Sequence, residues 1–205
     1  MISIYQIKPK FQQFLKPALT ALHKMGVSAN QITLASLVLS LFIGMAFWFA
    51  ADYPILFLAL PIGLFLRMAL NALDGMMART YNQQSKEGEV LNEIGDIFSD
   101  LFVFFPLIRF EQDHIYLIVV FICLSIINEF AGLLGKVIKG ERRYDGPMGK
   151  SDRAFVLGLY GIFSFLRIGF KSYSVWLFAI VNLLLVISTA TRIRKTLSDP
   201  EKTHS

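Results

Sequence analysis

Six long apolar runs constrain this chain more than any other feature of its sequence. Each approaches the ~20 residues that an α-helix needs to cross a bilayer. The predicted spans are Thr33–Ala51, Pro54–Leu73, Asn92–Ile108, His114–Gly135, Ala154–Leu166 extended toward Phe170, and Tyr173–Thr191. Because the runs are continuous instead of alternating apolar with polar residues, an outer-membrane β-barrel is excluded. We therefore expect an all-α integral membrane protein with six transmembrane helices.

Composition and charge further restrict the class of protein and predict its orientation in the membrane. The chain is 55% hydrophobic and only 17% charged, which excludes a soluble enzyme. Of its 20 lysines and arginines, sixteen lie in the termini and the loops of one side, three lie on the other side and Arg67 lies inside a span. This asymmetry predicts that both termini are cytoplasmic. It also explains the net charge of +5 without nucleic acid as a partner, and the single Cys123 excludes an intrachain disulfide framework.

The segment before the first span has its own pattern. Apolar residues recur at helical spacing from Phe11 to Met25, with lysines between them. This pattern predicts a cytoplasmic interfacial helix, for which anchoring is favoured over catalysis. Ser28 and Gln31 have the spacing of a capping box. We divide the chain into a juxtamembrane amphipathic segment at 1–32, a six-helix transmembrane catalytic domain at 33–192 and a cytoplasmic tail at 193–205.

Acids and amides gather where a membrane makes them costly. They are Asn71 and Asp74 at the end of the second run, and Asn92, Asp96 and Asp100 in the third. Such groups are functional candidates. Spacings of three and four residues place each set on one helix face. Two facing stripes of carboxylate and amide oxygens suit a hard divalent cation, so we expect Mg²⁺ or Mn²⁺.

Residues between the two stripes suit a diphosphate. Gly75 removes a side chain beside Asp74, Ala78 keeps the next turn small, and Arg79 offers a fork of donors for phosphate oxygens. Helical amphipathicity alone requires none of these residue types at these positions. The three histidines are scattered along the chain, which argues against a histidine-based metal site.

The run from Asn71 to Arg79, followed at fixed spacing by Gly88, Asn92 and Asp96, resembles the signature of the CDP-alcohol phosphotransferase family. That signature reads Asp-x2-Asp-Gly-x2-Ala-Arg-x8-Gly-x3-Asp-x3-Asp, and six of its eight fixed positions match. The six-span layout, the surface helix and the Asn30-x2-Thr33 entry to the first span extend the resemblance over nearly the whole chain. It implies a homodimeric enzyme of the bacterial inner membrane that transfers a substituted phosphate to a hydroxyl and releases CMP. The implied donor is a CDP-linked alcohol, commonly CDP-diacylglycerol.

The resemblance also implies roles for individual residues. Asn71, Asp74, Asn92 and Asp96 would surround the metal, and Asp96 would take the proton of the attacking hydroxyl. Gly75, Ala78, Arg79 and Gly88 would receive the cytidine diphosphate. This division of labour is positioning plus charge neutralisation, as is usual in phosphoryl transfer.

Two positions depart from the family signature. Asn71 and Asn92 stand where the signature has aspartate, so the matched site carries two negative charges instead of four. We expect weaker metal binding. Asp100, one turn beyond Asp96, would restore a third carboxylate as a compensating acid, act through Asp96, or pair with a basic group.

Further polar residues have two interpretations each. Arg67 and Glu129 lie at similar depths, which favours a buried ion pair; the functional alternative places Glu129 in the acceptor pocket. Lys150 and Arg153 begin the fifth span, where they either bind a headgroup or acceptor phosphate or merely follow the charge asymmetry.

The sequence thus favours a phosphatidyltransferase of phospholipid biosynthesis, with membrane lipids and an alcohol acceptor as partners. The alternative is a catalytically silent relative that acts as a lipid-binding scaffold or regulator. A small transporter is disfavoured because paired broken helices are absent from the predicted spans.

Overall fold

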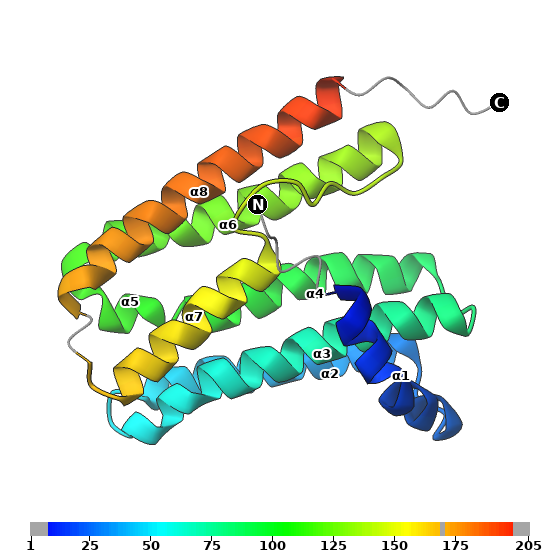
Figure 1. Ribbon diagram of the computed structural model, residues 1–205, viewed down its shortest axis with the longest axis horizontal. Helices are drawn as coiled ribbons and strands as arrows, with labels where there is room; N and C mark the ends of the chain where they lie inside the picture. Colours follow the sequence, from blue (N-terminus) through cyan, green and yellow to red (C-terminus); the bar gives the residue numbers. More distant parts are fainter. Residues whose placement is uncertain (1–7, 169–170, 199–205) are drawn as a thin grey trace. The chain divides into compact units, whose positions relative to one another are not determined.

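The computed structural model describes residues 8–168 and 171–198, and every regular element in these residues is helical. The elements are α1 (Lys8–Lys24), α2 (Ala29–Phe49), the 3₁₀ turn η2 (Pro54–Leu58), α3 (Ala59–Thr80), α4 (Lys86–Phe104), α5 (Leu107–Phe110), the 3₁₀ turn η3 (Gln112–His114), α6 (Ile115–Lys139), α7 (Lys150–Phe165) and α8 (Lys171–Ser198) (Figure 1). The prediction of an all-α protein is confirmed.

Among the residues that the structure describes, four helical segments are long and apolar enough to cross a membrane: Ala29–Phe49, Pro54–Thr80, Gln112–Lys139 and Tyr173–Ser198. Their mean hydropathies lie between 1.9 and 2.4. The other two predicted spans fall on α4, which carries several charges, and on α7, which has 16 residues. The number six therefore stays a prediction. The extension toward Phe170 lies outside the described residues, as do the outermost parts of the segments predicted at 1–32 and 193–205.

The described helices form two compact units. The first holds α1, α2, α3, α4 and the part of α7 from Ala154 onward, and the second holds α5, α6, the first turn of α7 and α8. The predicted division into three segments is a separate expectation, and it stays a prediction.

Small residues let the helices of the first unit approach closely. Ser28 and Gln31 form the predicted capping box at the start of α2. A Cβ on Gly44 of α2 would lie 2.1 Å from the Phe102 carbonyl oxygen of α4, and one on Gly63 of α3 would lie 2.5 Å from Ile43. Glycine at these positions therefore permits the close packing that is common between membrane helices.

Helix α1 is fixed against α3 instead of lying alone. Leu15 and Leu19 are buried in a cluster with residues of α2 and α3, among them Met77. The His23 ring stacks on the Tyr81 ring with centroids 3.5 Å apart. The interfacial position of α1 stays a prediction, but its packing places its polar side chains beside the end of α3.

In the second unit, a loop at residues 140–149 is fastened to α6 and α8. Gly140 ends α6 in a left-handed conformation. The Arg143 backbone N–H donates to the Gly132 carbonyl at 3.0 Å, and the Arg143 side chain occupies the space that Gly135 leaves free. The Ser188 hydroxyl of α8 donates to the Asp145 carbonyl at 3.2 Å. Both helices therefore hold the loop.

Candidate active site

The structure brings together the amide and the acid that the sequence placed on different helices. Asn71 lies on α3 and Asp96 on α4, and Asn71 Nδ2 donates to Asp96 Oδ1 at 3.5 Å. Asp74 follows one turn after Asn71 and is buried, whereas Asp96 is half-buried. Asn92, also half-buried, precedes Asp96 by one turn of α4.

Two hydroxyl groups of α2 complete this network. Thr33 Oγ1 donates to Asp74 Oδ2 at 3.1 Å, and Ser36 Oγ donates to Asn71 Oδ1 at 2.6 Å. The resemblance includes Thr33 only at the entry to the first span, and neither hydroxyl is among the predicted site residues. The signal for Ser36 is its spacing of three residues from Thr33 within an apolar run, which is also common in helices without such a role.

Asp100 and Arg67 form a buried ion pair in the first unit. Arg67 Nη2 lies 2.7 Å from Asp100 Oδ1, and the two side chains are 4% and 7% exposed. The preferred pairing of Arg67 with Glu129 was wrong, because similar depth along two helices does not identify which helices are neighbours. Of the three roles predicted for Asp100, the structure shows the pairing with a basic group, which is Arg67.

The glycines of the signature each make room for a specific neighbour. A Cβ on Gly75 would lie 3.2 Å from Arg79 Nη1, so the guanidinium rests over the glycine. A Cβ on Gly88 would lie 2.5 Å from the Asn30 side-chain oxygen, so Gly88 lets the start of α4 approach α2. Ala78 is half-buried and packs against the cluster that holds α1.

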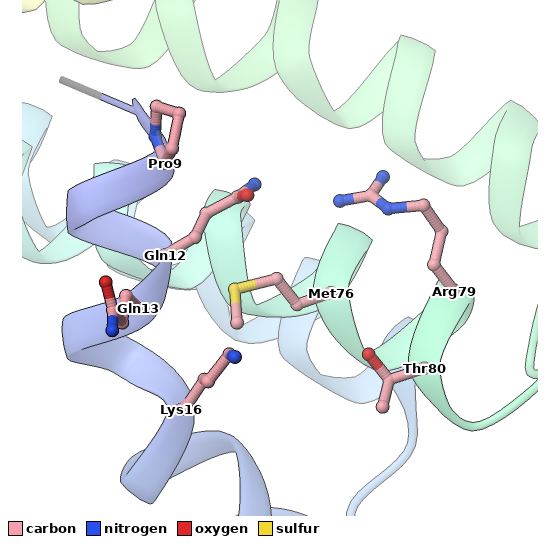
Figure 2. A pocket seen from close by; sticks show the side chains of 7 residues that line it. All are labelled: Pro9, Gln12, Gln13, Lys16, Met76, Arg79 and Thr80. Atoms are coloured by element: carbon pink, nitrogen blue, oxygen red, sulfur yellow. The ribbon is translucent and has the colours of Figure 1, made fainter. Parts of the chain in front are cut away.

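Arg79 also lines a cavity of about 520 Å³ between α1 and α3 (Figure 2). Its lining residues are Pro9, Gln12, Gln13 and Lys16 of α1, and Met76, Arg79 and Thr80 of α3. Figure 2 shows the Arg79 guanidinium and the Lys16 side chain reaching toward this space from the two helices. The lining is therefore cationic and amide-rich, and none of these seven residues is acidic.

The donor atoms of the predicted metal site are all oxygens, which fits a hard divalent cation. In the described part of the chain, no three His, Cys, Asp or Glu side chains come together as metal ligands. Two of the four predicted ligands, Asn71 and Asn92, are amides instead of carboxylates. A site built from these four residues therefore contains only two acidic ligands, Asp74 and Asp96. In the observed orientation the Asn71 oxygen faces Ser36, while its nitrogen faces Asp96.

The second unit contains a cluster of buried arginines around one acid. Glu129 of α6 lies 2.6 Å from Arg142 of the loop and 2.8 Å from Arg153 at the start of α7. Arg153 is 1% exposed, and its Nη1 also donates to the Met148 carbonyl at 3.1 Å. Lys150, the other predicted acceptor residue, lies one turn earlier on α7 and is half-buried.

A further arginine of this unit is not among the predicted site residues. Arg192 of α8 is buried, and it donates to the Asn128 carbonyl at 2.6 Å and the Asp145 carbonyl at 3.1 Å. The charge asymmetry predicts it only as a cytoplasmic charge that flanks the last span. Nothing in its sequence context distinguishes a buried arginine near a helix end from a solvated one, because the partners are carbonyl groups.

Comparison with known proteins identifies relatives over almost the whole chain. Residues 26–193 match the sequence profile of CDP-alcohol phosphatidyltransferases. The inner membrane protein YnbA of Escherichia coli strain K12 is 45% identical over 196 residues, which cover 96% of this chain and 97% of YnbA.

Solved structures share the fold. The phosphatidylinositol phosphate synthase PgsA1 of Mycobacterium tuberculosis, in complex with manganese and citrate, superposes with a TM-score of 0.73 at 20% identity, covering 92% of this chain and 91% of that one. The same synthase with CDP-DAG bound gives a TM-score of 0.73 at 19% identity, covering 92% and 96%.

Proposed function

Because this chain belongs to the CDP-alcohol phosphatidyltransferase family, we propose that it transfers the phosphatidyl group of CDP-diacylglycerol to the hydroxyl of an acceptor alcohol. The acceptor oxygen forms a bond to the phosphorus that carries the diacylglycerol, the bond from that phosphorus to the CMP oxygen breaks, and CMP leaves. The observation that carries this proposal is the meeting of Asn71 and Asp96 in one network with Asp74 nearby on α3.

Asp96 is the proposed general base. It is half-buried, so its carboxylate remains accessible to a ligand while the Asn71 amide orients it. A carboxylate in hydrogen-bond reach of the acceptor hydroxyl accepts its proton as the new bond to phosphorus forms. Asp96 therefore acts on the acceptor oxygen, and it needs no covalent intermediate.

We assign Mg²⁺ or Mn²⁺ to Asn71, Asp74, Asn92 and Asp96. The cation supplies charge neutralisation at the diphosphate. The oxygen donors fit such an ion, and the manganese complex of the PgsA1 synthase supports the assignment. Because asparagine replaces aspartate at two positions of the family signature, we expect weaker metal binding than four carboxylates would give. Asn71 contributes its oxygen only if the amide turns from its present orientation.

The donor diphosphate is assigned to Gly75, Ala78, Arg79 and Gly88, and the cavity beside Arg79 extends this site to Lys16 of α1. Two cations that line one space, with no acid among the lining residues, suit a diphosphate. Neither cation forms a salt bridge within the described residues. A volume of about 520 Å³ also lies in the range of small-molecule sites. The PgsA1 structure with CDP-DAG bound supports a CDP-lipid as donor.

On the acceptor side we assign Lys150 and Arg153 to an anionic group of the acceptor or a lipid headgroup. Glu129 acts through the arginines that it holds, because both its carboxylate oxygens are engaged by Arg142 and Arg153. We further propose a homodimer in the bacterial inner membrane with both termini and the active site on the cytoplasmic side. The four apolar helices and the inner-membrane relative YnbA support that location.

The test is CMP release by the purified protein from CDP-diacylglycerol, with Mg²⁺ or Mn²⁺ and a pool of alcohols. We expect release that requires metal and is lost in Asp96→Ala. The matched control is Glu87→Gln, which changes an exposed acid on the same helix and should retain activity.

The second candidate function is a catalytically silent lipid-binding scaffold or regulator, favoured by the two asparagines at the metal positions. It predicts that the protein releases no CMP with any acceptor, whether or not it binds the CDP-lipid, and that Asp96→Ala therefore has no effect on CMP release. Release that persists in Asp96→Ala would instead contradict the assignment of the general base.

A further inference from the structure

Two hydroxyls of α2 pair in register with two residues of the proposed active site on α3. Thr33 and Ser36 are three residues apart, as are Asn71 and Asp74. Thr33 bonds to Asp74 and Ser36 bonds to Asn71, so the earlier residue of one helix meets the later residue of the other. This order is the one expected of antiparallel neighbours, and it places both contacts on one helix face.

Each contact is partly buried and has one buried member, which makes it energetically significant. Ser36 is 3% exposed and Asp74 is 6% exposed. A buried carboxylate or amide without hydrogen bonds loses the full free energy of its hydration, whereas a hydroxyl donor recovers much of it. The single Thr33 hydroxyl proton is shared between Asp74 Oδ2 at 3.1 Å and the Ala29 carbonyl at 3.2 Å.

Ser36 departs from the usual behaviour of a serine in an apolar helix. Such hydroxyls normally donate to the carbonyl four residues earlier. Ser40 does so, with its Oγ 2.7 Å from the Ser36 carbonyl, and Thr33 does so in addition to contacting Asp74. Ser36 instead donates across the helix interface to Asn71 at 2.6 Å.

The Ser36 contact reaches Asp96 through the Asn71 amide. A carboxylate only accepts hydrogen bonds, so the amide must present its nitrogen to Asp96 and its oxygen to the hydroxyl. A hydroxyl both donates and accepts, so Ser36 can also support the opposite amide orientation, in which the oxygen becomes available as a ligand.

We propose that Thr33 and Ser36 are positioning residues of the metal and donor site, an inference that rests on the proposed function. Thr33 fixes the Asp74 carboxylate, and Ser36 supports the Asn71 amide in either orientation. Together they determine how the ligands supplied by α3 are presented to the cation. Residues that orient metal ligands in this way typically change metal affinity by about 10–100-fold when they are replaced.

The experiment measures Mn²⁺ binding by calorimetry, together with melting temperature and CMP release, for the full-length protein in detergent. Ser36→Ala and Thr33→Val should each weaken Mn²⁺ binding by about 10–100-fold. Ser40→Ala is the matched control: it removes a buried hydroxyl one turn away on the same helix and should leave Mn²⁺ affinity unchanged. Thr33→Ser restores the hydroxyl and should bind Mn²⁺ like the wild type.

The outcomes separate this proposal from the proposed function. Folded Ser36→Ala and Thr33→Val proteins with wild-type Mn²⁺ affinity would overturn the positioning role, even if CMP release by the wild type is intact. A wild type that binds Mn²⁺ in a hydroxyl-dependent way but releases no CMP would count against the transferase alone. A wild type without Mn²⁺ binding would overturn the positioning role whatever its CMP release. If Ser36→Ala does not fold, Ser36→Cys, with its weak donor, is measured in its place and should also lose affinity.

Discussion

The two units of this protein bury polar groups of opposite charge. The network of the first unit contains one arginine and three aspartates: Arg67, Asp74, Asp96 and Asp100. The cluster of the second contains three arginines and one carboxylate: Arg142, Arg153 and Arg192, with Glu129. The first unit thus gathers aspartates beside amide and hydroxyl groups, whereas the second gathers arginines around one acid.

The units also differ in how they satisfy these groups. In the first, hydroxyl and amide groups donate to two of the acids, Thr33 to Asp74 and Asn71 to Asp96, while Arg67 pairs with Asp100. In the second, Arg142 and Arg153 share the Glu129 carboxylate, and Arg192 donates to a backbone carbonyl. Both Glu129 oxygens therefore lie against arginines, whereas Asp96 is only half-buried and has one oxygen beside the Asn71 amide. This difference favours a direct role for Asp74 and Asp96 and an indirect one for Glu129.

Glu129→Gln tests this difference most severely. It leaves the buried Arg153 and the nearby Arg142 without their shared carboxylate, and breaking a buried ion pair costs about 3–5 kcal/mol. The unfolding equilibrium in SDS measures this loss, and Glu87→Gln, at an exposed site, should lose less than about 1 kcal/mol. Normal stability would show that the cluster does not depend on its acid, and normal CMP release by the folded variant would exclude Glu129 from the acceptor site.

Arg67→Met should produce the next largest effect, because it leaves Asp100 buried without its arginine. We expect a loss of about 3 kcal/mol in the same unfolding assay. The double variant Arg67→Met with Asp100→Leu replaces the pair by apolar residues and should recover most of that stability. If the double variant is less stable than the single one, Asp100 supports the site by more than its pairing with Arg67.

Asn71→Asp tests whether the neutral Asn71 amide beside Asp96 stabilises the first unit when no metal is bound. A carboxylate at this position faces Asp96, so repulsion should lower the melting temperature without metal. Mn²⁺ should then raise the melting temperature more than it does in the wild type, because ligand binding stabilises the folded state. A titration of melting temperature against Mn²⁺ measures both effects. An unchanged response to Mn²⁺ would remove position 71 from the metal site.

Lys16→Met should have the smallest effect, because the side chain is exposed. An exposed charge contributes about 0.2–1 kcal/mol, so the KM for the CDP-lipid should rise by about 1.4- to fivefold with little change in kcat. Lys24→Met changes another exposed lysine of α1 outside the cavity and should leave KM unchanged. Equal effects of the two variants would indicate a general surface charge instead of a donor site.

Local signals predicted local features well. The capping box of Ser28 and Gln31 begins α2 as expected, and the apolar runs correspond to helices. The spacing of the signature also predicted that Asn71 and Asp96 face a common space, because a helix converts sequence spacing directly into direction. The predicted positions of helix ends were less accurate. Helix α4 begins at Lys86, six residues before the start of the predicted span at Asn92.

Contacts between side chains of different helices were the features that the sequence predicted least well. Arg67 was matched to Glu129 by depth, but its partner is Asp100, because depth does not specify which helices pack together. The contacts of Thr33 and Ser36 with α3 are not predictable from the sequence, because hydroxyls in apolar helices usually bond to their own helix. The loop residue Arg142 reaches Glu129 only because the glycines of α6 let the loop settle on the helix, which no periodicity encodes.

The resting place of the Arg79 guanidinium over Gly75 makes the direction of its donors depend on a neighbouring position. A methyl group at position 75 would lie 3.2 Å from Arg79 Nη1, so the guanidinium, at the end of a flexible and exposed side chain, would have to shift by a few tenths of an ångström. Gly75→Ala therefore offers a way to change where Arg79 presents its donors without replacing the arginine.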